Sequence, residues 1–280
     1  MLMNKWSLRK KLEDFLEEDI GSGDPSTAFL FDNGQIKRGA FIAKEGGIFA
    51  GSDILLEAYH LLDSEIKVEC WKEDGEPLDR GDTIATITGN PIALLSGERV
   101  ILNLIQRMCG IATITNQVVH ELNNPAIQVC DTRKTTPGLR MLEKYAVTCG
   151  GGVNHRFGLY DGVMIKDNHI VAAGSIKKAI KQVREKLGHM MKIEVEVETE
   201  RQLEEAILAK PDIIMLDNME PALIKTLIGK IPKSILTEAS GNITIDNIRS
   251  YYDTGVDYIS LGFITQSAKA LDISFQMEEE

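Results

Sequence analysis

The sequence has few cysteines and prolines and no long hydrophobic run, and each shortage excludes a class of protein. The four cysteines lie far apart without a CxxC pair, which argues against a disulfide framework or a zinc site and suits reduced cytoplasmic thiols. Eight prolines in 280 residues and no extended polar tract exclude a largely disordered chain. No apolar stretch approaches the ~18 residues of a membrane span, and the N-terminus carries charges of both signs, unlike a signal peptide. We expect a globular cytoplasmic protein without a membrane partner.

Basic residues are in the minority, yet they are concentrated in one segment. The chain has 31 Lys and Arg against 42 Asp and Glu, a formal net charge of −11. This acidic excess argues against a nucleic-acid partner, because duplex binding usually needs a basic face. Between Asp131 and His169, however, six Lys and Arg stand against four Asp and Glu, so this segment is +2 and the remainder −13. A small cationic site in an acidic body predicts a small anionic ligand.

From about Glu98 onward the sequence alternates between apolar runs and amphipathic helical segments. A long helical stretch at 97–123 comes first, with Gly110 as a point where it is expected to break. Six apolar runs follow, at 127–134, 161–168, 192–198, 212–218, 234–241 and 257–262. Helical patterns separate most of them, at 139–147, 174–187, 201–209, 221–230 and 244–255. This alternation predicts βα units around a parallel sheet, whereas the first hundred residues predict a mixed, less regular unit.

The six predicted strands favour an α/β barrel over a dinucleotide-binding sheet. The first strand runs into CDTRK and not into the GxGxxG turn of dinucleotide-binding folds. The strands end in polar residues or glycine, namely Arg133 and Lys134, then Lys166, Glu196, Asp217, Ser240 and Gly262. In a barrel the carboxyl ends of all strands converge on one face, where active sites lie. We therefore predict that these residues share one rim.

The cations of this rim suit a ligand with several negative charges. Lys134 and Lys166 end strands, and Arg133, His155 and Arg156 lie on neighbouring loops. A guanidinium binds carboxylate or phosphate through two parallel hydrogen bonds, whereas an ammonium acts as a compact charge. One such residue alone would most simply be a solvated surface cation, but several at successive strand ends predict an anion site.

The acidic and small residues of the rim add two further functions. Glu196 and Asp217 suit magnesium, directly or through water, or a developing cation. Ser240, Gly241 and Gly262 are small enough to let backbone N–H groups approach a phosphate, on the late strands where barrel phosphate sites occur. No Cys–His or Ser–His–Asp nucleophile arrangement and no metal-binding histidine spacing is present in the sequence. The residues alone predict an anion-binding barrel enzyme.

The 40-residue run DTRKTTPGLRMLEKYAVTCGGGVNHRFGLYDGVMIKDNHI (131–170) resembles the signature region of the quinolinate phosphoribosyltransferases, or carboxylating nicotinate-nucleotide pyrophosphorylases. The resemblance covers nearly the whole chain, through EEDIGSGDPST, GERVILNLIQRMCGIAT, IEVEVE, IIMLDN, EASGNI and TGVDYISLGFIT. It implies transfer of a phosphoribosyl group from 5-phosphoribosyl 1-pyrophosphate to quinolinate with decarboxylation. The products would be nicotinate mononucleotide, pyrophosphate and CO2, in de novo NAD biosynthesis, with Mg2+ as the metal.

The resemblance further implies the architecture. An N-terminal α/β sandwich at 1–105, completed by about 268–280, would pack against an irregular, incomplete α/β barrel at 106–267. The protein would be a homodimer in which each sandwich covers the barrel mouth of the partner. Arg99 would reach across this interface and hold a carboxylate of quinolinate.

The remaining site residues follow from the same resemblance. The quinolinate dicarboxylate would be clamped by Thr132, Arg133, His155 and Arg156. Lys134 and Lys166 would face the pyrophosphate and ribose phosphate charges, and Glu196 and Asp217 would hold the ribose hydroxyls and magnesium. These last four would be the catalytic residues, since the carboxylates also favour an oxocarbenium-like ribosyl centre. The 5-phosphate would be cradled by the backbone of Ser240, Gly241, Asn242, Leu261, Gly262 and Phe263.

Two short segments depart from the family's usual pattern. The chain has Thr265, Gln266 and Ser267 where members often read THS, and GDPST at 23–27 where GDxTT is more usual. Gln266 thus replaces a histidine that assists phosphate or pyrophosphate binding. We expect altered affinity and not lost activity.

Three alternatives remain beside this interpretation. The first is a molybdenum-transport-associated relative of the same fold with another substrate, against which MIKDNHI at 164–170 argues. The second is transfer onto nicotinate without decarboxylation, which an intact dicarboxylate clamp disfavours. The third is a catalytically silent, metabolite-binding barrel, in which Lys134, Glu196 or Asp217 would be expected to be lost.

Overall fold

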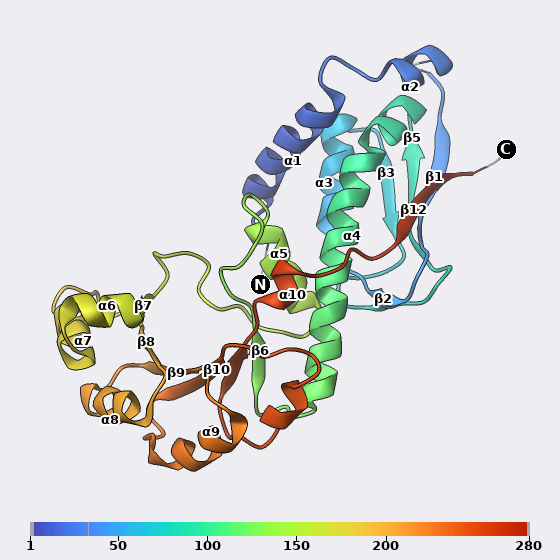
Figure 1. The fold of residues 1–280 in the computed structure, drawn as a ribbon. Coiled ribbons are helices and arrows are strands. Elements are labelled where there is room, and N and C mark those ends of the chain that lie inside the picture. Colours follow the sequence, from blue (N-terminus) through green and yellow to red (C-terminus); the bar gives the residue numbers. More distant parts are fainter. Residues whose placement is uncertain (1–2, 33, 279–280) are drawn as a thin grey trace. The chain divides into compact units, whose positions relative to one another are not determined.

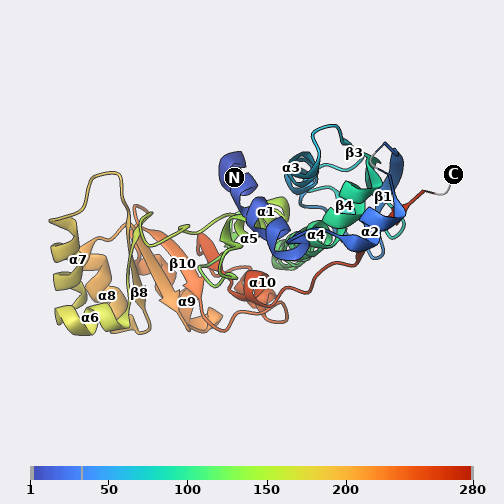
Figure 2. The same cartoon turned by 90° about the horizontal axis from the view of Figure 1, so that it is seen from above.

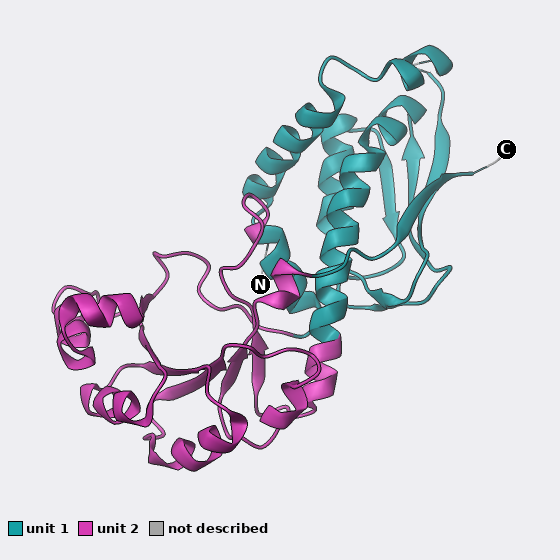
Figure 3. Ribbon diagram, in the orientation of Figure 1, with its two compact units in different colours: residues 1–116, 141–151, 268–280 teal, residues 117–140, 152–267 magenta. Residues whose placement is uncertain are grey.

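The computed structural model describes residues 3–32 and 34–278 and divides the chain into two compact units (Figure 3). Unit 1 combines residues 1–116, 141–151 and 268–280, and unit 2 combines residues 117–140 and 152–267. The division expected at residue 105 falls inside one continuous helix, α4 (Pro91–Leu122). None of the helices in the described part of the chain has the length and apolar character needed to cross a membrane.

Unit 1 is built on a four-stranded antiparallel sheet in the order β12-β1-β5-β3, with a separate β2-β4 pair. Its strands are β1 (Lys37–Ala43), β2 (Gly47–Ile48), β3 (Lys67–Cys70), β4 (Pro77–Leu78), β5 (Thr83–Gly89) and β12 (Ile273–Met277). Besides most of α4, its helices are α1 (Lys5–Ile20), α2 (Pro25–Leu30), α3 (Ser52–Leu62) and nearly all of α5 (Arg140–Cys149). The mixed, irregular unit expected from the first hundred residues is confirmed.

Local sequence explains where the first two helices of unit 1 begin. Asn4 caps α1 by accepting a hydrogen bond from the Ser7 N–H at 3.1 Å, and every fourth residue from Leu8 to Leu16 is buried. The GDPST segment supplies the next cap, because the Asp24 carboxylate accepts from the backbone of Ser26 at 3.0 Å. This segment therefore starts α2 within unit 1.

Gly110 does not break α4, contrary to the sequence prediction. A Cβ at this position would lie 2.0 Å from the carbonyl oxygen of Lys269, so the glycine lets the C-terminal segment cross the helix at close range. Beyond the crossing, Leu271 donates its N–H to Gln106 O at 2.9 Å, and β12 pairs with β1 from Ala43↔Ile273 to Gly39↔Met277. The glycine is explained by packing and not by a kink.

Unit 2 is an open parallel sheet of six strands in the order β6-β11-β10-β9-β8-β7. Its strands are β6 (Gln128–Cys130), β7 (Val163–Ile165), β8 (Ile193–Val197), β9 (Ile213–Asp217), β10 (Leu236–Ser240) and β11 (Tyr258–Ser260). All six strands predicted from the apolar runs are present. Within the described residues, β6 and β7 are the two edges of the sheet and do not pair with each other. The irregular, incomplete α/β barrel is therefore confirmed.

The helices of unit 2 flank this sheet. They are α6 (Asp167–Ala173), α7 (Ile176–Arg184), α8 (Glu200–Ala209), α9 (Pro221–Leu227) and α10 (Phe263–Gln266), with the 3₁₀ turns η1 (Ile228–Lys230) and η2 (Ile248–Tyr251). Helices α6, α7 and α8 lie together on one side of β8 in both orientations (Figures 1 and 2). The helix expected at 244–255 is wrong, since η2 is all that forms there. Helix α6 was not expected, because none of its residues is buried and it shows no apolar stripe.

Candidate active site

The carboxyl ends of the six strands surround a cavity of about 670 Å³. Its lining includes the rim predicted from the sequence, namely Thr132, Arg133, Lys134, His155, Arg156, Lys166, Glu196, Asp217, Ser240, Gly241, Asn242, Gly262 and Phe263. Parallel pairing explains the convergence, since the register sets the final residue of β9, Asp217, beside the final residue of β10, Ser240. Gln266, at the position where the family often has histidine, lines the same cavity.

Two of the predicted site residues do not line this cavity. Leu261 is 1% exposed, and its N–H donates to the Cys130 carbonyl at 2.9 Å. The amide of Leu261 is thus committed to the sheet, and its side chain belongs to the core. Arg99 lies on α4 in unit 1, with its side chain 63% exposed and 4.0 Å from Glu98.

A lysine and two carboxylates form the centre of the rim. Lys166 Nζ lies 2.5 Å from Glu196 Oε2. Burial raises the pKa of Asp217, the nearby Glu196 charge raises it further, and Lys166 opposes both effects. Two carboxylates that repel one another favour any positive centre that comes between them. The arrangement suits a divalent cation or a positive charge that develops on a ligand.

Lys134 is held on its loop from two directions. Its N–H donates to Thr132 Oγ1 at 3.0 Å, and its carbonyl accepts from Thr265 Oγ1 at 2.8 Å. A Cβ on Gly262 would lie 2.8 Å from Lys134 Cδ, so the glycine leaves the space that the lysine stem occupies. The first residue of the Thr265–Ser267 segment therefore supports the lysine loop, a role that the sequence did not reveal.

Two residues outside the predicted set position the basic loops. Asp131 is fully buried and accepts hydrogen bonds from the His155 N–H at 3.0 Å and from Asn154 Nδ2 at 2.6 Å. Arg140 donates to Thr135 Oγ1 at 3.0 Å and to the Phe157 carbonyl at 3.1 Å. Both side chains tie the loop after β6 to the loop before β7, so the cations on the two loops keep a fixed spacing.

The two predicted guanidiniums lie close enough to affect one another. Arg156 Nη1 donates to the Gly162 carbonyl at 2.9 Å. Burial lowers the pKa of Arg156, and the Arg133 charge lowers it further. An anion that binds between two partly buried positive charges stabilises both of them, because it offsets their mutual repulsion. The pair suits a ligand with two neighbouring carboxylates.

Beneath the rim, His155 faces the two buried carboxylates of Glu194 and Glu238. His155 Nε2 is 3.1 Å from Glu194 Oε2 and 3.6 Å from Glu238 Oε2. His155 Nδ1 accepts from the Arg156 N–H at 2.7 Å, so the neutral ring carries its hydrogen on Nε2 and donates it toward the carboxylates. The sequence missed this cluster, because its three members lie on separate elements. It could have been anticipated only from the alternation that sets Glu194 beneath Glu196.

Glu238 holds its proton unusually strongly. Burial raises the pKa of Glu238 to about 7, the Glu194 charge contributes to the rise, and His155 opposes it. Oε1 of both Glu194 and Glu238 is buried without a hydrogen-bond partner among the described residues. A carboxylate with an unsatisfied buried oxygen favours its neutral form. The cluster therefore holds one ionised carboxylate more readily than two.

We expect Glu238 to make the folded state less stable as pH rises from about 4.5 to about 7. Across this window the folded protein retains a proton that the unfolded chain releases, so the stability present at low pH is lost. Glu238→Gln should flatten this dependence by on the order of 2 kcal/mol between pH 5 and pH 8. Urea unfolding at both pH values measures the difference. Glu198→Gln, at an exposed position, is the control, and equal slopes for Glu238→Gln and the unchanged protein would contradict the assignment.

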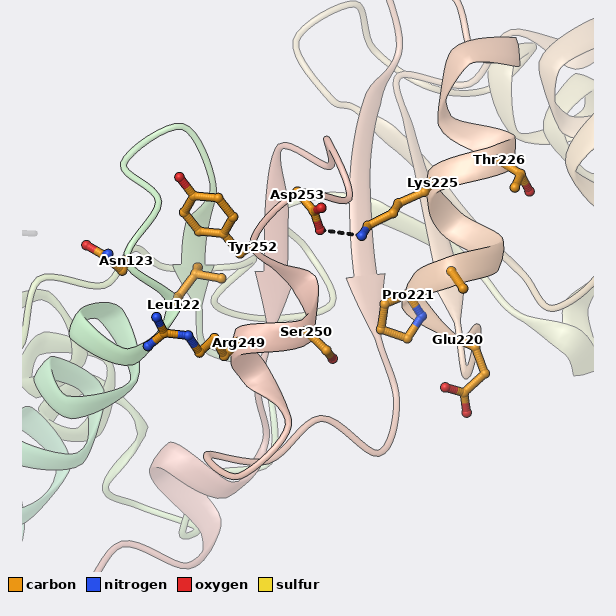
Figure 4. A pocket seen from close by; sticks show the side chains of 11 residues that line it. Leu122, Asn123, Glu220, Pro221, Lys225, Thr226, Arg249, Ser250, Tyr252 and Asp253 are labelled. Carbon is orange, nitrogen blue, oxygen red and sulfur yellow. Dashed lines mark ion pairs between the residues drawn. The ribbon is translucent and has the colours of Figure 1, made fainter.

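A larger hollow of about 980 Å³ lies elsewhere on unit 2, beside the end of α4, α9 and η2 (Figure 4). Its cations are already paired, Lys225 with Asp253 at 2.6 Å and Arg249 with Glu121 at 3.5 Å. The rim cavity instead gathers several cations around few acids. Charge, and not volume, distinguishes the ligand site.

A parallel barrel sheet whose carboxyl edge carries cations, two carboxylates and glycine-containing loops defines an enzyme for small phosphorylated and carboxylated molecules. Residues 24–109 match the family described as the quinolinate phosphoribosyl transferase N-terminal domain, and residues 111–276 match its C-terminal domain. The chain belongs to the quinolinate phosphoribosyltransferase family, a family of pentosyl-transferring enzymes.

Individual relatives agree with this membership. A protein of Bacillus subtilis strain 168 named probable nicotinate-nucleotide pyrophosphorylase (carboxylating) is 54% identical over 275 residues, or 98% of this chain and 95% of that protein. The crystal structure of NadC from Streptococcus pyogenes is 41% identical with a TM-score of 0.95, and the match covers 100% of both chains. The nicotinate-nucleotide pyrophosphorylase of Francisella tularensis is 38% identical with a TM-score of 0.94, over 99% of this chain and 98% of that one.

Proposed function

We propose that this protein transfers the phosphoribosyl group of 5-phosphoribosyl 1-pyrophosphate to quinolinate and releases CO2, pyrophosphate and nicotinate mononucleotide, as a step of de novo NAD biosynthesis. Family membership supports the proposal. The observation that carries it is the single cavity in which Arg133, Lys134, Lys166, Glu196 and Asp217 meet. Two strongly anionic substrates need such cations, and the ribosyl centre between them needs the carboxylates.

Quinolinate would be bound by the basic loops. Arg133 and Arg156 hold its adjacent carboxylates, with Thr132 lending a hydroxyl contact and His155 forming the wall beneath them. In a homodimer, Arg99 of the partner subunit would add a third guanidinium. This assignment agrees with the exposed side chain of Arg99, whose guanidinium lies 4.0 Å from the Glu98 carboxylate, too far for a hydrogen bond.

The phosphoribosyl donor would lie across the remaining rim. Lys134 and Lys166 face the pyrophosphate and ribose phosphate charges, and Glu196 and Asp217 hold the ribose hydroxyls. The 5-phosphate would be cradled by the loops after β10 and β11, namely Ser240, Gly241, Asn242, Gly262 and Phe263. Gly241 has a φ of +89°, which lets backbone N–H groups turn toward an anion.

Glu196 and Asp217 also fit magnesium. Carboxylate oxygens are the ligands that Mg2+ takes from proteins, usually together with water and substrate phosphates. The raised pKa of Asp217, which results from burial and the neighbouring Glu196 charge, indicates that a cation would relieve the repulsion there. When bound, the metal would help neutralise the pyrophosphate charge.

The proposed chemistry uses the protein's fixed charges at each step. The pyridine nitrogen of quinolinate bonds to the anomeric carbon while the bond to pyrophosphate oxygen breaks, and the carboxylates stabilise the positive ribosyl centre. Ribosylation makes the ring cationic. The bond between the ring and the 2-carboxylate then breaks, CO2 leaves, the ring accepts the electron pair, and a proton replaces the carboxylate.

The assembly belongs to the same proposal. We assign an α/β sandwich domain to residues 1–105 with about 268–280 and the phosphoribosyltransferase barrel to 106–267, in a cytoplasmic homodimer. The return of β12 to the unit 1 sheet supports the discontinuous sandwich domain.

Quinolinate labelled in its 2-carboxylate tests the reaction directly. Labelled CO2 should appear in step with the mononucleotide and should depend on added magnesium. Nicotinate should be used roughly 10²-fold less efficiently or worse, because it leaves part of the cationic clamp unpaired. Comparable use of nicotinate would contradict the substrate assignment. The absence of any turnover would favour a silent binding barrel or a molybdenum-transport-associated relative.

A further inference from the structure

We infer that Asn218 is a positioning residue that couples the Asp217 carboxylate to the phosphate loop at 240–242 and so sets the site for ribose 5-phosphate. The inference rests on the proposed function and assigns a role to a residue outside the predicted set. Asn218 follows β9 directly and lines the rim cavity. Its side chain is the link between two groups that would hold opposite ends of the same sugar phosphate.

The two ends of the Asn218 amide are both used. Nδ2 donates to Asp217 Oδ2 at 2.6 Å, and Oδ1 accepts from Asn242 Nδ2 at 2.9 Å. The backbone makes a third link, because the Asn218 N–H donates to the Ser240 carbonyl at 2.8 Å. Only a side chain with one donor and one acceptor at this reach can join a carboxylate to an amide donor in this way.

The backbone around this link is held in the left-handed region. Asn218 has a φ of +53°, Gly241 of +89° and Asn242 of +54°. Asparagine tolerates this conformation better than other residues with a Cβ, but it still costs energy that the surroundings must offset. The network extends outward through Asn247 Nδ2, which donates to the Asn242 carbonyl at 3.0 Å. Strain maintained by hydrogen bonds at a cavity wall is typical of a pre-organised site.

Gly241 shows how closely the loop approaches Asn218. A Cβ at position 241 would lie 2.2 Å from Asn218 Oδ1 and 2.8 Å from its backbone nitrogen. The phosphate loop is therefore packed against the asparagine as well as bonded to it. A ligand that contacts both Asp217 and the loop therefore meets two groups that Asn218 links, as the ribose hydroxyls and the 5-phosphate of one sugar phosphate would.

The substitution Asn218→Gly removes the side chain and keeps the backbone conformation, since glycine adopts a positive φ at no steric cost. We expect the KM for 5-phosphoribosyl 1-pyrophosphate to rise roughly tenfold to a hundredfold, because the hydrogen bond to the charged Asp217 carboxylate is lost together with the bond from Asn242. The KM for quinolinate should stay within about twofold. Asn123→Gly is the matched control, because Asn123 is also left-handed, with φ +49°, but does not line the rim cavity. It should change neither KM.

Direct binding adds a readout that a merely structural defect would not produce. In titration calorimetry, Asn218→Gly should weaken the binding of ribose 5-phosphate more than the binding of inorganic phosphate. Ribose 5-phosphate contacts both Asp217 and the loop, whereas inorganic phosphate contacts the loop alone. Adding Asn242→Gly to Asn218→Gly should cost little more, because both changes break the same hydrogen bond. Equal weakening of the two probes, or an unchanged KM for the phosphoribosyl donor in an active enzyme, overturns the positioning role. An inactive unchanged protein would instead overturn the proposed function.

Discussion

Replacing Lys166 with methionine is expected to lower kcat/KM by roughly 10²- to 10³-fold. The substitution removes the ammonium that lies 2.5 Å from Glu196 Oε2 and faces the substrate charges in the proposed complex. It also removes the lysine charge that opposes the repulsion between Glu196 and Asp217. Steady-state kinetics with both substrates varied measures the loss.

The same variant should shift the pH dependence in a defined direction. Lys166 lowers the pKa of Asp217 against the effects of burial and Glu196, so its removal raises that pKa. The acid limb of the pH–rate profile should therefore move to higher pH. Lys186→Met, at an exposed position of unit 2, should leave both the rate and the profile unchanged. A Lys166→Met enzyme with activity within about threefold of the unchanged protein would refute the central role of this lysine.

Mixing two inactive variants is expected to restore activity. Arg99→Ala should abolish most turnover by removing the guanidinium proposed to come from the partner, and Lys134→Ala should do so from within the barrel. After subunit exchange at equal amounts, half of the dimers are hybrids, and one of the two sites in each hybrid has both residues intact. About a quarter of the unchanged activity should therefore return.

Two controls make this recovery interpretable. Exchange is monitored with differently tagged subunits, and each variant incubated alone should remain inactive. A mixture of the single variant Arg99→Ala with a double variant that carries both Arg99→Ala and Lys134→Ala should not recover activity, since every site lacks Arg99. Proven exchange without recovery in the first mixture would show that Arg99 acts within its own subunit or not at all.

The strand ends were predictable because residues that are adjacent in the sequence mark each of them. Each apolar run ends in a charged or small residue, and the parallel register brings these positions to one edge, as the pairing of Asp217 with Ser240 shows. The failures have physical causes as well. The stretch at 244–255 buries only Ile248 and Tyr251 within its helical turn, a spacing of three that suits a 3₁₀ turn better than an α-helix.

Contacts between distant segments could not be read from the sequence. Glu238 lies in LTEAS, where a single acid in a short strand gives no hint that it will face His155 at 3.6 Å. Asp131 opens a conspicuous basic motif, yet its task is to hold the backbone of His155 from within the core. The hydrogen bonds of Asn218 depend on a left-handed turn, which an asparagine permits but does not require.

The crossing of α4 at Gly110 has a consequence for how the protein is made. The sheet of unit 1 is completed by β12, which pairs Met277 with Gly39, so the strand on this side of β1 is translated long after β1, β3 and β5. Until then β1 has an unpaired edge beside a sheet that has otherwise been translated, and such edges recruit other chains. Newly made chains are therefore most prone to aggregate between the translation of β5 and the pairing of β12, and a chain without residues 273–277 would carry that exposed edge permanently.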